Sequence, residues 1–302
     1  MRLTIAGQTI DIPPGVYLIL AGPTAVGKTA VAEEIAEQRA VEIISADSRQ
    51  VYRGMDIGTA TPSRELLVRI PHHFINELSP DMVWSAGAFY REARKRIRHI
   101  LEHGKLPLVV GGTGLYLDAL RNGLFKEPPR KAVIREKYEA ELERIGTESL
   151  WRRLNDIDPA YAALFHHHDT KKLVRAFEIF ELTGMPPTQA FAKSQDPFEV
   201  GSLMVILNRP RAELYERINL RVQQMVSAGL VKECQDLLSA GYEPTLYPLK
   251  TIGYQETFAY LDGTISEAEM IASIQQATRN FAKRQLTWFR NHPYDCWIDL
   301  ED

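Results

Sequence analysis

The chain has 302 residues, enough for one large domain or two ordinary ones, and its formal net charge of -3 argues against a generally basic nucleic-acid binder. No stretch approaches the roughly 20 apolar residues of a membrane span, and the start lacks the layout of a signal peptide, so we expect a cytoplasmic protein without a membrane partner. Cys234 and Cys296 lack the spacing of a zinc site or a disulfide framework, which predicts two packed free thiols.

The first predicted elements are a strand, a loop and a helix. Residues 16–20 are a short apolar run, and residues 28–39 have helical spacing. The segment GPTAVGKT at 22–29 lies between them and satisfies the phosphate-loop pattern G-x-x-x-x-G-K-[ST] in the context that this motif requires. Inward-pointing backbone N–H groups and a helix amino terminus favour an anion, so we expect these residues to bind phosphate groups: Gly22, Pro23, Thr24, Ala25, Val26, Gly27, Lys28 and Thr29.

Two side chains of this loop have expected roles. Lys28 should reach the terminal phosphates, and the Thr29 hydroxyl can hold Mg²⁺ that bridges them. P-loop nucleotidases usually supply a second magnesium ligand, an Asp after a later strand, but the apolar strand at 106–110 runs into Gly111 and Gly112. The strand-end acid is instead Asp47, after the apolar strand at 41–45. Asp47 is therefore the candidate general base.

The remaining elements complete the expected fold. An apolar strand at 203–207 precedes a helical pattern from Arg211 to about Arg290, and a last strand is expected at 296–300. Between about 123 and 197 helical spacing dominates, at 131–144 and 171–182, with edges marked by Pro128, Pro129, Pro186, Pro187 and Pro197. We predict an α/β fold: a P-loop nucleoside-triphosphatase-like parallel sheet with flanking helices at 1–122 and 198–302, and an inserted helical subdomain at 123–197.

Basic residues gather in two runs. Residues 91–105 carry six basic residues against two acidic ones, and residues 279–290 carry four basic residues and no acid. A solvated helix face explains either run as well as an RNA-facing stripe does. Charge alone does not distinguish the two.

Several ordered blocks together resemble the bacterial tRNA dimethylallyltransferases, also called tRNA isopentenyltransferases. They are GPTAVGKT at 22–29, SADSRQVYRGMDIGTA at 45–60, VGGTGLY at 110–116, KKLVRAFEIFELTG at 171–184, IGYQE at 252–256 and AKRQLTWFR at 282–290. The chain departs from the family pattern at Thr61, at Asn76 and at His166, His167 and His168. We expect the three adjacent histidines to lie in a surface loop and not to form a metal site.

The resemblance implies transfer of a dimethylallyl group from its diphosphate to the exocyclic amine of the adenosine 3′-adjacent to the anticodon, with Mg²⁺ as cofactor. The P-loop would hold a diphosphate leaving group, with Lys28, Asp47 and Thr113 in catalytic roles. The acceptor base must be extruded from the anticodon loop. The resemblance also implies that the inserted subdomain at 123–197 binds tRNA. The tRNA anticodon stem-loop would contact Asp47, Ser48, Arg49, Gln50, Thr113, Arg135, Lys171, Lys172, Arg175, Lys250, Gly253, Gln255, Lys283, Arg284 and Arg290.

Two alternatives remain open at the level of sequence. A small-molecule or nucleoside kinase would share the P-loop and the strand-end acid, but it would need ATP and arginines in a lid. A non-enzymatic, nucleotide-dependent RNA-binding protein would need the basic runs but not Asp47. Arg217 is either a further cation for the diphosphate or a plain surface residue. Nothing in the sequence points to an obligate protein partner.

Overall fold

The computed structural model describes residues 1–125, 131–193, 195–196 and 198–300. It divides into two compact units, a core unit of Met1–Arg121 with Glu199–Asp302 and an inserted unit of Asn122–Phe198. These bounds fall beside the divisions predicted from the sequence at 122/123 and 197/198. Pro128, Pro129 and Pro197, expected at the edges of the insert, lie outside the described residues. No helix in the described part of the chain is long and apolar enough to cross a membrane.

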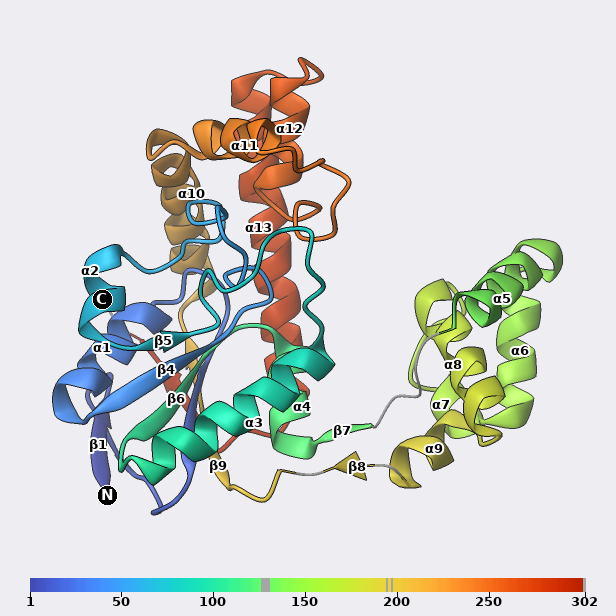
Figure 1. The fold of residues 1–302 in the computed structure, drawn as a ribbon, viewed down its shortest axis with the longest axis horizontal. Helices are drawn as coiled ribbons and strands as arrows, with labels where there is room; N and C mark the ends of the chain where they lie inside the picture. The colour runs from blue at the N-terminus through green and yellow to red at the C-terminus, as the bar shows by residue number, and fades with distance from the viewer. Residues whose placement is uncertain (126–130, 194, 197, 301–302) are drawn as a thin grey trace. The chain divides into compact units, whose positions relative to one another are not determined.

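A six-stranded sheet organises the core unit in the order β10-β9-β3-β6-β4-β5 (Figure 1). Every pairing in it is parallel, which confirms the predicted sheet type. Its strands are β3 (Tyr17–Ala21), β4 (Val41–Ala46), β5 (His72–His73), β6 (Leu106–Gly111), β9 (Ser202–Asn208) and β10 (Cys296–Asp299). The amino-terminal hairpin of β1 (Arg2–Ile5) and β2 (Gln8–Asp11) was not predicted.

Helices flank this sheet or pack on its flanking helices. Those described in the core unit are α1 (Lys28–Gln38), α2 (Arg64–Arg69), α3 (Ala86–Glu102), α4 (Gly114–Asn122), α10 (Arg211–Ser227), α11 (Leu230–Ser239), α12 (Tyr254–Leu261) and α13 (Glu267–Arg290). One apolar cluster joins Leu18 and Leu20 of β3 to Ile35 of α1, Ile218 of α10 and Leu286 of α13. Helices α10 and α13 thus pack near the strand that precedes the phosphate loop.

The cysteines and the carboxy-terminal helical region refine the sequence predictions. Cys234 is buried and Cys296 half-buried, and both thiols are free, as expected. The helical pattern expected from Arg211 to about Arg290 is interrupted between α11 and α12, where residues 240–253 form turns. Gly and Pro at 241, 244 and 248 explain the interruption, because both residues disfavour helix interiors.

The inserted unit is helical, with α5 (Ala132–Ile145), α6 (Thr147–Ile157), α7 (Pro159–Ala162), α8 (Thr170–Thr183) and α9 (Pro187–Lys193). The short strands β7 (Leu124–Phe125) and β8 (Gln195–Asp196) pair antiparallel. Tyr138 stacks on Phe177 within an apolar cluster of its own. His166, His167 and His168 lie in the turn before α8, exposed or half-buried, which agrees with the predicted surface loop.

The parallel register brings three strand ends to one edge of the core sheet. Ala21 of β3 pairs with Gly111 of β6, and Gly111 pairs with Ala46 of β4. The segments that leave these strands are the phosphate loop, Asp47 and the Gly111–Gly114 turn. Ligands of open α/β sheets bind at this edge.

Candidate functional site

The phosphate loop adopts an anion-binding conformation. Gly22 has a φ of 154°, Ala25 one of 64° and Gly27, the N-cap of α1, one of 114°. A Cβ at Gly22 would approach the Leu207 carbonyl oxygen to 2.6 Å, so the first position of the motif requires glycine. Positive φ angles at these three positions curve the backbone tightly before the start of α1, the kind of turn that lets N–H groups surround a phosphate.

Lys28 is half-buried at the start of α1, and its ammonium group is enclosed by the loop. Its Nζ donates to the carbonyl oxygens of Gly22 at 2.9 Å and Pro23 at 2.8 Å. Burial of the ammonium group lowers the pKa of Lys28 to about 7; the nearby Arg221 lowers it further, and the Asp47 carboxylate opposes the shift. A bound anion would stabilise the charged ammonium group, so this side chain is poised to gain a proton when phosphate arrives.

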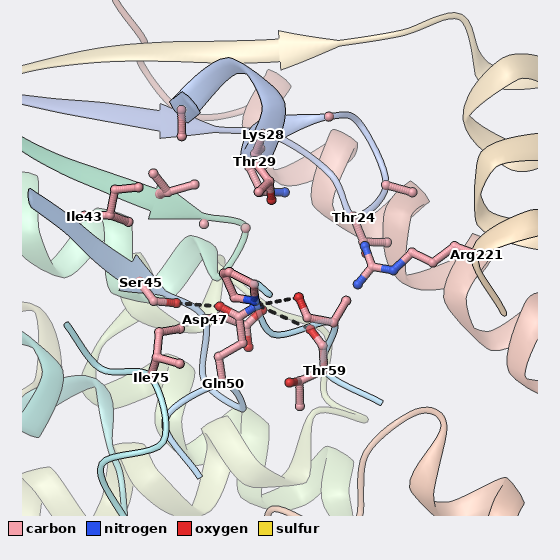
Figure 2. Close-up of a pocket in the computed structure, with 18 of the residues that line it drawn as sticks. Thr24, Lys28, Thr29, Ile43, Ser45, Asp47, Gln50, Thr59, Ile75 and Arg221 are labelled. Carbon is pink, nitrogen blue, oxygen red and sulfur yellow. Dashed lines mark hydrogen bonds between the residues drawn. The ribbon is translucent and has the colours of Figure 1, made fainter. Parts of the chain in front are cut away.

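Asp47 follows β4 directly, where the sequence predicted it. Its Oδ1 accepts the backbone N–H of Arg49 at 2.8 Å, which fixes the carboxylate in a tight turn. This contact leaves Oδ2 for a ligand. Gln50 supports the same turn: its Oε1 accepts from the Ser45 hydroxyl at 2.8 Å, and its Nε2 donates to the carbonyls of Thr59 and Ala60 (Figure 2).

A cavity of about 440 Å³ opens over the phosphate loop. Thr24, Lys28 and Thr29 line one part of it, and Asp47 is the only carboxylate among the described lining residues. Figure 2 places Ile43 and Ile75 on the side away from Arg221. The further apolar lining comes from Ala32, Leu66 and Val110. The cavity therefore offers a cationic, hydrogen-bonding part and an apolar part.

A second cavity of about 330 Å³ adjoins the first. The two share lining residues, namely Thr24, Asp47, Thr59, Arg221, Phe281 and Gln285. The second is also lined by sequence-predicted RNA contacts: Ser48, Arg49, Thr113, Lys250, Gly253, Gln255 and Arg284. Asp47 thus stands on the wall that both cavities share.

Two arginines of α10 reach the phosphate loop. The sequence left the role of Arg217 open. In the structure it lines the first cavity and donates from Nε to the Ala25 carbonyl at 3.1 Å. Arg221 was missed, although it lies one helical turn further on the same face; its Nη1 contacts the Thr24 hydroxyl at 3.4 Å. Burial lowers the pKa of the Arg221 guanidinium, and Asp47 acts in the opposite direction.

The other predicted tRNA contacts lie outside the two cavities. Lys283 and Arg290 are exposed on α13, and no described carboxylate forms an ion pair with either. Four more lie in the inserted unit. There Lys171 is exposed, Arg135 pairs with Glu139 and Lys172 with Asp169.

Arg175, the fourth of these, differs from the surface residues. Its side chain is only 14% exposed and pairs at 2.8 Å with Glu178, which is 1% exposed. Both partners lie on α8, and loss of either one would leave an uncompensated buried charge. A tRNA contact by Arg175 remains a prediction.

The two basic runs have different surroundings. In residues 91–105, Lys95 pairs with Glu92, Arg96 with Glu77, Lys105 with Glu42, and Arg94 and Arg98 with Glu199. Neighbouring acids thus offset this run, which favours a solvated face. On α13, Arg284 lies over the Phe281 ring, 5.7 Å from its centroid, beside the second cavity.

Comparison with known protein families gives two matches. The model of a family described as IPP transferase matches residues 50–292, and one described as isopentenyl transferase matches residues 14–79. The matches cover both the P-loop and the Asp47 turn as well as the α13 helix.

Individual relatives agree with the family models. A tRNA dimethylallyltransferase from Chlorobium phaeobacteroides is 46% identical over 94% of this chain and 91% of its own length, and one from Thermotoga neapolitana is 43% identical over 93% and 92%. Among solved structures, the tRNA isopentenylpyrophosphate transferase of Bacillus halodurans has a TM-score of 0.70 and 38% identity, covering 95% of this chain and 90% of that one. A eukaryotic dimethylallyltransferase acting on tRNA has a TM-score of 0.79 and 26% identity, covering 95% and 74%.

Proposed function

The chain belongs to the IPP transferase family, and from that membership we propose that it transfers a dimethylallyl group from dimethylallyl diphosphate to tRNA. The acceptor is the exocyclic amine of the adenosine 3′-adjacent to the anticodon, and diphosphate is released. The relatives whose names describe this activity match nearly the whole chain, and the two family models together span the residues that line both cavities. The proposal assigns the first cavity to the donor and the second to the acceptor base.

The first cavity suits an allylic diphosphate. Backbone N–H groups of the phosphate loop, the Lys28 ammonium and the guanidinium groups of Arg217 and Arg221 surround its polar part. A five-carbon branched chain would fill the apolar part beside Ile43 and Ile75. The charged diphosphate of the donor would thus meet cationic groups, and its hydrocarbon chain would meet apolar side chains.

The second cavity suits an extruded purine. The residues that line it include the hydroxyl-bearing Thr113 and Thr278, the amide of Gln255 and the Phe281 ring, which offer base-edge hydrogen bonds and an apolar surface. Single-stranded RNA is read by such groups more than by bulk charge. This explains how a chain with a net charge of -3 can serve a polyanionic substrate.

The proposed step makes a carbon–nitrogen bond and breaks a carbon–oxygen bond. The amine lone pair attacks the first carbon of the allyl chain, and the electron pair of the broken bond leaves with the diphosphate. Oδ2 of Asp47 accepts the amine proton, which matters because ring delocalisation makes this amine a weak nucleophile. Lys28, Arg217 and Arg221 stabilise the negative charge that develops on the leaving oxygen.

The residues present fit a magnesium ion in the donor site. The protein ligands on offer are hard oxygens, chiefly the Thr29 hydroxyl, and Mg²⁺ commonly combines one or two protein oxygens with substrate phosphates. Bound there, Mg²⁺ would neutralise charge on the diphosphate. The single carboxylate among the described residues of the cavity, Asp47, is then available as the base.

The observation that carries the proposal is the position of Asp47 on the wall common to the two cavities. The test is incubation of the purified protein with radiolabelled dimethylallyl diphosphate and unmodified tRNA, and separately with ATP and nucleosides. We expect label in tRNA and no transfer of phosphate to nucleosides. Phosphate release from ATP at about 1 per second or more would favour a kinase or ATPase instead. Binding of tRNA with no transfer of label would favour a non-enzymatic RNA-binding protein.

A further inference from the structure

The side chain of Gln285 connects two loops of the site that are far apart in sequence. It projects from α13, is 7% exposed and lines both cavities. Its Oε1 accepts the backbone N–H of Thr24 in the phosphate loop at 2.9 Å. Its Nε2 donates to the carbonyl oxygen of Gly112, in the turn after β6, at 2.9 Å.

The two partners fix the chemistry of the connection. A backbone N–H can only donate and a carbonyl can only accept, so this position needs a side chain that accepts at one end and donates at the other. A glutamine amide does both. The fit is also tight, because a Cβ at Gly112 would lie 2.3 Å from Nε2 of Gln285.

Each connected loop positions a different reactant. Thr24 lines both cavities, and its hydroxyl contacts Arg221 on the donor side. Gly112 lies between Gly111, which pairs with Ala46 directly before Asp47, and Thr113, whose N–H donates to the Ala46 carbonyl at 3.3 Å. The amide therefore links the donor loop to the turn whose backbone is hydrogen-bonded to the residue before Asp47.

We propose that Gln285 is a positioning residue of the transfer reaction, which holds the phosphate loop and the Gly111–Gly114 turn at the separation that the chemical step requires. The proposal rests on the proposed function. Misplacement of reacting groups by about 1 Å can lower a rate about 100-fold. Loss of the two hydrogen bonds of this amide should therefore lower the transfer rate substantially. Substrate affinity depends on many other contacts and changes less.

Two variants test the role. Gln285→Met keeps the length and removes both hydrogen bonds, and Gln285→Glu keeps the acceptor but places an oxygen opposite the Gly112 carbonyl. We expect single-turnover transfer at saturating substrates to fall about 10-fold to 100-fold in both, with tRNA affinity within about threefold of wild type. The matched control is Gln276→Met, at an exposed glutamine of the same helix, and should leave the rate unchanged.

The pH profile separates positioning from packing. In Gln285→Glu the introduced carboxyl group can again donate to the Gly112 carbonyl once it is protonated, and burial beside a carbonyl favours protonation. The rate of Gln285→Glu relative to wild type should therefore rise from about pH 8 to about pH 6, whereas that of Gln285→Met should not. Wild-type rates in both variants, or equal pH dependence in both, would overturn the proposal.

Hydrogen exchange provides a readout independent of transfer. Loss of its hydrogen bond to Gln285 should speed hydrogen exchange of the Thr24 amide in Gln285→Met. The comparison uses the whole protein and requires that the variant and the wild type melt at the same temperature. If the wild type transfers no dimethylallyl group but Thr24 exchange is still faster in Gln285→Met, the proposed function is refuted and the connection between the loops stands. An active wild type with unchanged Thr24 exchange in Gln285→Met would refute the connection alone.

Discussion

The hydroxyl of Tyr254 donates a hydrogen bond to the carboxylate of Glu233 at 2.6 Å, and the same carboxylate accepts the backbone N–H groups of Asp56, Ile57 and Gly58 at 2.7–3.0 Å. Tyr254 is fully buried, and its pKa is raised, chiefly by burial and by the Glu233 charge. One side chain of α11 thereby anchors the loop that carries Thr59, which lines both cavities.

Removing the Tyr254 hydroxyl should destabilise the core unit. In Tyr254→Phe the carboxylate loses one of four donors, and hydrogen bonds to charged groups contribute about 1.5–3 kcal/mol. We expect the free energy of unfolding to fall by about that amount in urea titrations. Tyr260→Phe, at a half-buried position of the same helix, is the control. Equal stability of the two variants would show that the Glu233 anchor contributes little.

Asp47→Asn tests the general base. The Asn oxygen can still accept the Arg49 N–H, so the turn is preserved while the basic oxygen is lost. Single-turnover transfer should fall about 100-fold to 10,000-fold, with donor affinity retained. Asp81→Asn, at an exposed position, should transfer at the wild-type rate. Retention of more than about a tenth of the rate by Asp47→Asn would mean that the carboxylate orients the amine without taking its proton.

Donor binding should be coupled to protonation of Lys28. Because the pKa of Lys28 in the free protein is about 7 and an anion raises it, diphosphate binding at pH 7 should take up about half a proton at this site. The affinity for diphosphate should then fall as pH rises above 7. Calorimetry in buffers of different ionisation enthalpy measures the uptake.

Lys28→Arg is the matched control for that measurement, since arginine stays charged throughout this range. The protonation of diphosphate itself is common to both proteins and cancels in the comparison. Equal proton uptake by wild type and Lys28→Arg would show that Lys28 is already charged in the free protein.

The exposed basic residues of α13 should contribute phosphate contacts. Changing Lys283 and Arg284 to Ala is expected to weaken tRNA binding and to reduce the slope of log affinity against log salt by about 1.4, at roughly 0.7 per single-strand contact. Diphosphate affinity should be unaffected. Arg91 and Lys95 of α3, from the other basic run, are the matched control pair. Unchanged tRNA affinity of the α13 variant at low salt would identify this surface as merely solvated.

The parts of the site that the sequence predicted depend only on residues that are close together along the chain. The phosphate loop and Asp47 follow strands whose apolar runs are continuous, so their place at the sheet edge follows from the strand positions alone. Gln285 and Glu233 gave no such signal. The partners of Gln285 lie 173 and 261 residues away, and the backbone N–H groups that Glu233 accepts lie 175–177 residues away. The α13 block was assigned to tRNA contact from its family resemblance and its basic residues, although its buried Gln285 contacts the phosphate loop directly.

The fold shows the same division between local and distant information. The central strands were predicted to within one or two residues, whereas β1 and β2 were missed because their few apolar residues are mixed with Gln8, Thr9 and Asp11. Arg217 could not be assigned from the sequence, since a helix periodicity does not say which neighbour its polar face meets. Only the packing of α10 near β3 places that guanidinium beside Ala25.

The strand order also bears on biosynthesis. β3 lies between β6 and β9, and the whole inserted unit is translated after β6 and before β9 begins at Ser202. A chain that leaves the ribosome amino terminus first therefore presents one unpaired edge of β3 until the insert has been made, and pairings this distant form slowly. We expect the insert, with its own apolar cluster, to fold before the central sheet closes, and the open β3 edge to be the segment that chaperones protect during synthesis.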